Sequence, residues 1–143
     1  MTIVAIDYGE RKLGIATADK STLVVFPHGV IERHSIKRDL TALRTSLEEL
    51  KATLVIVGLP LNMDGGVGPA AVAAQKFAQI VHDATGLEVQ LFDERLSTFE
   101  AKERLKAAPK HSRRSARVDA VAAAVILEAW IEAHRLHINK LSG

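Results

Sequence analysis

Residues 3–14, IVAIDYGERKLG, place an acid directly after an unbroken apolar run and two residues before a glycine. An unbroken apolar run predicts a strand that is buried on both faces, as the strands of parallel sheets are. In open α/β sheets, ligands bind in the groove beyond the carboxyl ends of such strands. Asp7 is therefore expected at a binding site, and Gly9 lets the chain turn away there with little bulk.

The remaining pattern predicts a mixed sheet flanked by helices. Predicted strands cover residues 2–7, 11–19, 21–33, 53–60 and 87–94. The first three follow one another without a helix, which predicts an antiparallel meander, and Pro27 places the third at an edge because proline cannot donate to a ladder. Crossover helices precede the last two, which predicts that they are parallel. The fold class is therefore α/β, although the strand order cannot be read from the pattern.

Helices are predicted where apolar residues recur at helical spacing between recognisable ends. Ser35 is the expected cap of the first helix, which runs to about residue 52. Pro69 and Gly86 delimit the second, over residues 69–85. A capping box of Ser97 and Glu100 begins a third, through about residue 107, and a last helix covers about 115–137.

Length and composition favour one domain over residues 1–143. With 48% hydrophobic and 25% charged residues, a chain of this size can bury most of its apolar surface. The absence of cysteine excludes disulfides and thiolate metal sites and makes the cytoplasm the expected compartment. Asp7 comes too early for a signal peptide, and the apolar run between Asp119 and Glu128 is too short for a membrane span. We expect no membrane association.

Acids follow the apolar structure at two further places. Asp93 and Glu94 end the last predicted strand, and the two-residue period places Glu94 on the face of Phe92 and Asp93 on the opposite face. Asp119 lies near the start of the last helix, in line with the stripe Ala123, Ile126 and Trp130, which must be buried.

Taken singly, each acid has an ordinary structural explanation. An aspartate after a strand is commonly a turn former, and an acid in the first turn of a helix compensates the helix dipole. Taken together, three elements each place an acid beside apolar structure, and like charges repel unless a cation lies among them. A ligand set of oxygens alone favours Mg²⁺ or Mn²⁺.

Four strings resemble the YqgF/RuvX family of RNase H-like nucleases, described as Holliday junction resolvases and as pre-16S rRNA processing nucleases: IVAIDYGERKLGIA, IVGLPLNMDG, FDERLST and VDAVAAAVIL. The resemblance spans nearly the whole chain and implies an RNase H-like fold. It also implies a carboxylate triad, which maps onto Asp7, Glu94 and Asp119. The chain has Ala120 where family members often have serine, so a hydroxyl near the site is missing.

The resemblance implies phosphodiester hydrolysis by two metal ions. In this interpretation Asp7 bridges the ions, Glu94 and Asp119 are flanking ligands, and Asp93 is a supporting or spare acid. The acids hold metal and need not exchange protons themselves.

Basic residues concentrate in the stretch from Lys102 to Arg117. This stretch contains seven of them and the single acid Glu103, and it leads directly to Asp119. This stretch is either a solvated face or a phosphate clamp. The candidate nucleic-acid-binding residues are Arg11, Lys12, Arg95, Lys110, Arg113, Arg114 and Arg117. Aromatic residues make up only 4% of the chain, which favours recognition of shape or backbone over base stacking.

The leading hypothesis is a metal-dependent endonuclease acting on structured nucleic acid, with pre-16S rRNA maturation on ribosomal precursor particles slightly ahead on the resemblance. The alternative is a Holliday junction resolvase, which must cut two symmetric strands and therefore predicts a homodimer. Two further alternatives are a non-catalytic nucleic-acid-binding module and a phosphotransferase or ATPase. The last would need two lobes around a nucleotide, for which the chain is short.

Overall fold

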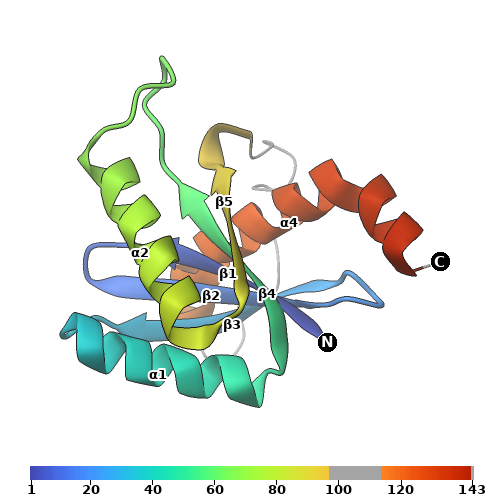
Figure 1. Ribbon diagram of the computed structural model, residues 1–143, viewed down its shortest axis with the longest axis horizontal. Helices are drawn as coiled ribbons and strands as arrows, with labels where there is room; N and C mark the ends of the chain where they lie inside the picture. The colour runs from blue at the N-terminus through green and yellow to red at the C-terminus, as the bar shows by residue number, and fades with distance from the viewer. Residues whose placement is uncertain (97–113, 143) are drawn as a thin grey trace.

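The computed structural model describes residues 1–96 and 114–142, with the side chains of 114–119 and 136–142 outside that description. Five strands form one mixed sheet (Figure 1). They are β1 (Thr2–Tyr8), β2 (Lys12–Asp19), β3 (Val25–Glu32), β4 (Ala52–Leu59) and β5 (Glu88–Asp93). The strand order is β3-β2-β1-β4-β5, with β1–β2 and β2–β3 antiparallel and β1–β4 and β4–β5 parallel. The predicted meander, parallel strands and edge position of Pro27 are confirmed.

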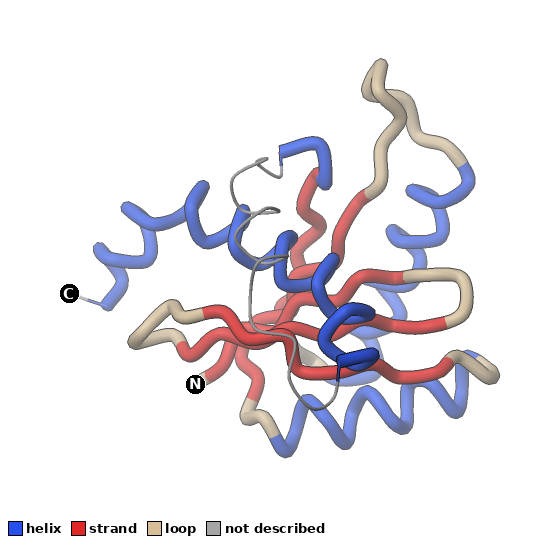
Figure 2. Tube along the Cα trace, turned by 180° about the vertical axis from the view of Figure 1, so that it is seen from behind, coloured by secondary structure: helices blue, strands red, loops and turns tan. Residues whose placement is uncertain are grey.

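Helices cover both faces of this sheet (Figures 1 and 2). The helices α1 (Ile36–Glu49) and α2 (Pro69–Thr85) lie on one face, and α4 (Arg114–Ser142) lies on the other. Within the described residues, no helix is both long and apolar enough to cross a bilayer.

The apolar run of β1 is unbroken because both of its faces are covered. Ile3 and Ala5 pack in the core that α4 closes, whereas Val4 and Ile6 pack in the core beneath α1 and α2. All four side chains are at most 3% exposed. By the same two-residue alternation, Asp7 belongs to the α4 face.

Local signals set the start of α1 and the end of α2 as predicted. The Ser35 hydroxyl accepts a hydrogen bond from the Arg38 amide at 3.2 Å, which caps the first turn of α1. Gly86 has φ 73°, the left-handed conformation that ends a helix and that glycine adopts without strain.

Several predicted boundaries differ from the structure, and α1 ends at Glu49 instead of near residue 52. The last strand ends at Asp93, because the Asp93 carboxylate accepts the Arg95 amide at 2.9 Å and turns the chain into a short 3-10 helix, η1 (Glu94–Leu96). The third strand begins at Val25, and α4 continues to Ser142, since no glycine or proline interrupts it. The helix predicted over residues 97–107 lies outside the described residues.

Candidate active site at the strand ends

Asp7 is half-buried near the carboxyl end of β1, on the face that α4 covers. Its antiparallel partner on β2 is Gly14, and the β1–β4 register, which pairs Ile6 with Val57, brings Gly58 to its other side. Neither neighbour projects a side chain over the carboxylate. Among the described residues, none donates a hydrogen bond to the Asp7 carboxylate or forms an ion pair with it, and burial raises the pKa of this carboxyl above the ordinary value.

Glu94 reaches the same place from β5. A Cβ built on Gly58 would lie only 3.1 Å from Glu94 Cδ and 3.2 Å from Glu94 Cγ, so the glutamate side chain lies directly over this glycine. Gly58 shares the α4 face with Ile56, by the alternation along β4. Asp7 and Glu94 therefore meet on one face of the sheet, beside and above Gly58.

Asp119 lies on the part of α4 that leads toward β1 and β2. The Trp130 indole donates to Gln90 of β5 at 3.1 Å, and Ile126 Cδ1 lies 2.6 Å from the Cβ position of Gly58 on β4. Followed toward its start, the helix thus passes from β5 to β4, and it packs against β1, β2 and β3 as well. Asp119 precedes Ile126 by two turns. Its backbone is helical, while its side chain lies outside the described residues, as the opening turns of α4 do.

The predicted buried stripe of α4 is confirmed. Ala123, Ile126 and Trp130 are at most 5% exposed and belong to the core on this face. Ala120, at 0%, is fully buried as well.

Asp93 faces away from this pair, as the strand alternation predicted. Val89, two pleats earlier on β5, packs in the opposite core with α1 and α2. The Asp93 carboxylate forms an ion pair with Arg95 at 2.8 Å, and the hydrogen bonds from Arg95 lower the pKa of Asp93. Asp93 thus has a local structural task in turning the chain at the end of β5.

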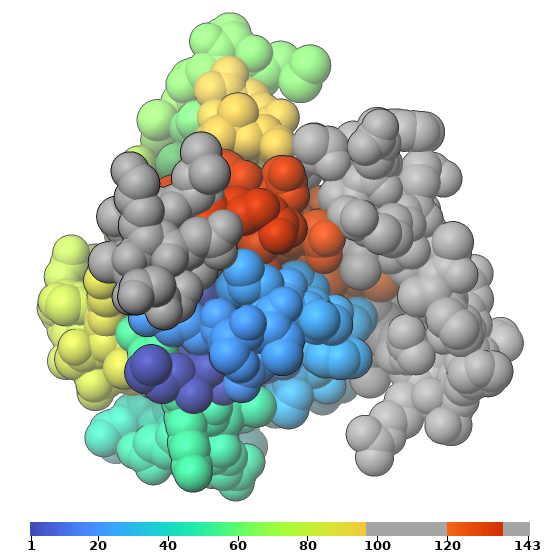
Figure 3. Space-filling view, turned by 90° about the vertical axis from the view of Figure 1, so that its right-hand side faces the viewer, coloured from blue at the N-terminus to red at the C-terminus, as the bar shows by residue number. Residues whose placement is uncertain are grey.

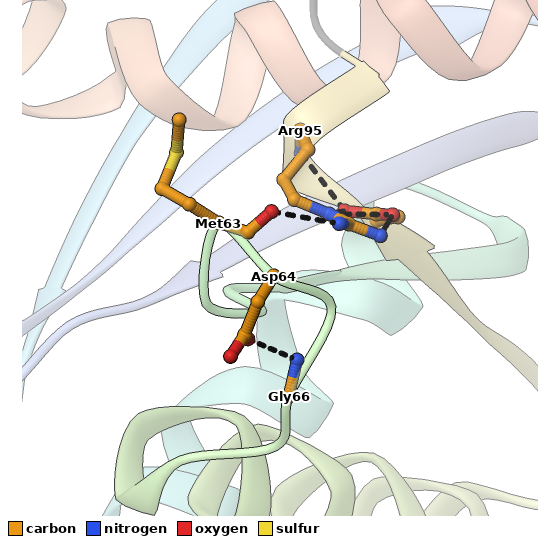
Figure 4. A network of polar contacts seen from close by, with 5 residues as sticks. Met63, Asp64, Gly66 and Arg95 are labelled. Carbon is orange, nitrogen blue, oxygen red and sulfur yellow. Dashed lines mark hydrogen bonds and ion pairs between the residues drawn. The ribbon is translucent and has the colours of Figure 1, made fainter.

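Arg95 joins this turn to the loop after β4. Its Nη1 lies 3.5 Å from the Met63 carbonyl oxygen, and Asp64 Oδ1 accepts the Gly66 amide at 2.8 Å within the same loop (Figure 4). The Asp64 contact is an Asx turn, in which the side chain accepts from the backbone amide two residues later. The phosphate-binding role of Arg95 stays a prediction, since its guanidinium is engaged with Asp93.

The other basic candidates divide into two groups. Arg11 and Lys12 are exposed where the chain turns from β1 into β2, close in sequence to Asp7. Lys110 and Arg113 lie outside the described residues, and only the backbone of Arg114 and Arg117, in the first turns of α4, is described.

Sequence reasoning missed Arg33, which fastens the turn after Asp7. Its guanidinium lies 4.3 Å from the centroid of the Tyr8 ring and donates to the Tyr8 hydroxyl and to the Gly9 carbonyl, each at 2.7 Å. Arg33 Nε lies 3.9 Å from Asp39, which is 5% exposed. An available signal was Asp39 itself, because it occupies the buried stripe of α1 with Leu43 and Leu47.

The donor set fits a hard divalent cation in part. Asp7 is a half-buried carboxylate with no donor among the described residues, and Glu94, from the turn after β5, lies over Gly58 on the intervening strand β4. Carboxylate oxygens are the ligands that Mg²⁺ and Mn²⁺ prefer. Among the side chains that the structure describes, no three metal-binding groups gather. A third ligand would have to come from outside that set, where Asp119 lies.

The mixed sheet with helices on both faces defines an RNase H-like fold. Thermus thermophilus RuvC in complex with a Holliday junction substrate matches with a TM-score of 0.62 at 17% identity, over 93% of this chain and 96% of that one. The fowlpox virus Holliday junction resolvase matches with a TM-score of 0.54 at 11% identity, over 93% and 99% of the two chains. These likenesses confirm the predicted fold class.

The chain belongs to the RuvX family, whose model is described as Holliday junction resolvase and matches residues 1–133. A relative from Myxococcus xanthus, named as a pre-16S rRNA nuclease, is 42% identical over 136 residues, which cover 94% of this chain and 90% of the relative. A relative of the same name from Syntrophomonas wolfei is 35% identical over 133 residues, covering 92% and 94%. The predicted family is confirmed.

Proposed function

We propose that this chain is a metal-dependent endonuclease that hydrolyses phosphodiester bonds in structured nucleic acid. The observation that carries the proposal is the placement of Asp7 beside Gly58 and of Glu94 over it, on the face covered by α4. Asp119 is proposed as the third acid, from its place in the opening turns of α4. One nuclease domain over residues 1–143, working in the cytoplasm, is part of the same proposal.

These residues would act by holding cations rather than by moving protons. A bound pair of Mg²⁺ or Mn²⁺ ions would supply an activated water and would stabilise the departing oxygen. Asp7 is suited to the bridging position because burial disfavours its charged form unless a cation is near. Glu94 would add a ligand from the end of β5, and the glycines beside Asp7 leave its carboxylate open to a phosphate.

The 5′ end of pre-16S rRNA, in ribosomal precursor particles, is the substrate that we propose first. It rests on the names of the relatives, which are 35% to 42% identical over nearly their whole length. Branched DNA is the second candidate, and the family description together with the fold of a junction-bound RuvC favours it. That candidate requires a homodimer with two matched sites.

Two other functions have less support. A non-catalytic nucleic-acid-binding module would be favoured by a missing acid, and none of the three positions has lost its carboxylate. A phosphotransferase would need a second lobe to close over a nucleotide, and the described residues form one sheet with its covering helices.

The test is cleavage of a 16S precursor transcript and of a synthetic four-way junction in parallel, each with Mg²⁺, Mn²⁺ or chelator. We expect metal-dependent cutting by the intact chain and none by Asp7→Asn or Glu94→Gln, with unchanged circular dichroism. Asp19→Asn is the matched control, because Asp19 lies exposed at the other end of the sheet, opposite Thr2. Full activity of Asp7→Asn would overturn the site assignment.

A further inference from the structure

The loop between β4 and α2 projects from the strand-end side of the molecule (Figures 1 and 2). We call residues Asn62–Gly66 the loop tip. Met63, within the tip, is 94% exposed, and Val67, just beyond it, is 52% exposed. Figure 3 shows the loop standing above the turn that follows β5, where Leu96 is 59% exposed. The loop and the turn thus each expose apolar side chains at the end of the sheet where Asp7 and Glu94 lie.

The loop tip is held in one shape by its own hydrogen bonds. The Asn62 amide donates to the Gly66 carbonyl at 2.9 Å, and the Gly65 amide donates to the Asn62 carbonyl at 2.8 Å. Asp64 caps the Gly66 amide, and Gly65 has φ 87°, which only glycine adopts at low cost. An isolated exposed methionine is ordinary, but this one is presented by a rigid turn.

Arg95 fixes the position of the loop tip relative to Glu94. A Cβ on Gly65 would lie 3.5 Å from Arg95 Nη1, so the guanidinium packs against the tip as well as approaching the Met63 carbonyl (Figure 4). Arg95 follows Glu94 directly in the chain, and its charge is paired with Asp93. The residue next to a proposed metal ligand therefore contacts the loop tip that carries Met63.

We propose that Met63 is an apolar contact for a nucleobase, reached when a strand with an unstacked base enters the site. This inference rests on the proposed function and deepens it by naming what the site would recognise. Methionine is among the side chains that insert between base steps, and the flexible thioether adapts to any base. A fully stacked duplex offers no such base face, so the contact would favour branch points, loops and strand ends.

A protein partner is the less suitable occupant of this surface. The apolar residues stand on a narrow projecting turn (Figure 1). A turn of this shape fits a gap between bases better than it covers a broad apolar face.

The experiment measures binding by fluorescence anisotropy at fixed salt, with chelator present so that no cutting occurs. The probes are a four-way DNA junction, a 16S precursor fragment with an unpaired leader, and a matched DNA duplex, each with 2-aminopurine at the branch, leader or central position. Partial burial of one methionine corresponds to roughly a five- to tenfold change in affinity. We expect Met63→Ala to weaken binding of the first two probes by about that factor. The change in 2-aminopurine fluorescence that the intact protein causes on binding should also be lost.

Three comparisons make the result specific. Met63→Leu should retain affinity, and Arg95→Ala should give a partial loss on the same probes because the tip is released. Phe26→Ala is the matched control, since Phe26 is 61% exposed on β3, at the other edge of the sheet. Equal affinities of intact protein and Met63→Ala on all probes would overturn the inference, and so would an equal loss on the duplex.

Comparing the DNA junction with the RNA precursor fragment also shows which of the two nucleic acids supplies the base. A loss confined to the RNA probe or to the junction supports the contact and identifies the substrate that supplies it. If the nuclease proposal is wrong, the intact chain will not cut either substrate with either metal. The binding measurements do not depend on cutting, so they still test the Met63 contact.

Discussion

Glu94 lies over Gly58, and the absence of a side chain at position 58 is what admits it. A Cβ there would stand 2.6 Å from Ile126 Cδ1 and 3.1 Å from Glu94 Cδ. The glycine therefore joins three elements at one point: the end of β4, the turn after β5 and the middle of α4. Position 58 is thus a place where core packing and the proposed active site depend on the same atoms.

Gly58→Ala should damage both stability and cutting. The Ile126 side chain must shift, and overpacking of this kind costs about 1–3 kcal/mol. Glu94 must also move, and misplacing a catalytic group by an ångström costs about 100-fold in rate. We expect Gly58→Ala to unfold at lower urea concentration. Its metal-dependent cleavage should fall by more than the decrease in the folded fraction accounts for.

Gly29→Ala is the matched control for this substitution. Gly29 is also a strand glycine, but a Cβ there meets nothing within 4 Å. Its stability should stay within about 0.5 kcal/mol of the unmodified chain. Equal behaviour of the two variants would show that Gly58 does not position Glu94.

Asp7→Asn should change the pH dependence of stability. Burial raises the pKa of Asp7 in the folded chain, so the folded state binds its proton more tightly than the unfolded state does. Stability is therefore lost as pH rises from the unfolded value of 3.8 through the raised folded pKa, and the deficit persists at neutral pH. The amide has no such titration, so Asp7→Asn should gain stability relative to the unmodified chain as pH rises through this window.

The measurement is chemical denaturation between pH 3 and 7 in chelator, then at neutral pH with Mg²⁺. Added Mg²⁺ should stabilise the unmodified chain more than Asp7→Asn, because the amide does not replace the carboxylate as a metal ligand. Asp19→Asn should show the opposite pH trend, since hydrogen bonds from Ser21 lower the pKa of Asp19. A pH-independent difference between Asp7→Asn and the unmodified chain would contradict the burial argument.

Local chemistry made much of the fold predictable. The apolar run at residues 3–6 signalled a strand covered on both faces, and Ser35 and Gly86 set helix ends through their own hydrogen bonding and backbone freedom. The face of Glu94 and that of Asp93 followed from the two-residue period, which holds along any strand.

Contacts between distant segments were not predictable in this way. The space over Gly58 is shared by residues 94 and 126, and nothing in the local sequence of either one indicates the other. The same holds for Arg33, whose partners Tyr8 and Gly9 are 25 and 24 residues away in the chain. The predicted strand ran one residue too far, to Glu94, because it is a hydrogen bond to the Asp93 side chain that turns the chain, and the hydrophobic pattern carries no signal for it.

Arg33→Ala should destabilise the chain by about 2–4 kcal/mol, because it removes several hydrogen bonds and leaves Asp39 buried without its cation. Arg33→Lys should fall between, since it keeps the charge and loses the planar fork that reaches Tyr8 and Gly9. Arg135→Ala is the control, because its ion pair with Glu132 is exposed and worth under about 1 kcal/mol. Urea denaturation of the three variants is the measurement. A loss of unfolding free energy in Arg33→Ala no larger than that in Arg135→Ala would show that Arg33 does not stabilise the turn after Asp7.

Arg11→Ala with Lys12→Ala should weaken nucleic-acid binding at low salt and flatten its salt dependence. Both side chains are exposed at the turn beside Asp7, and each phosphate contact contributes about 0.7 to 0.9 to the slope of log affinity against log salt. The loss should be the same for every base sequence, because phosphates carry no sequence information. Arg44→Ala with Lys51→Ala is the matched control, since these residues line a groove with Ala52 and Leu87, at the amino ends of β4 and β5. An unchanged slope in the first variant, or an equal change in the second, would place the nucleic acid elsewhere on the molecule.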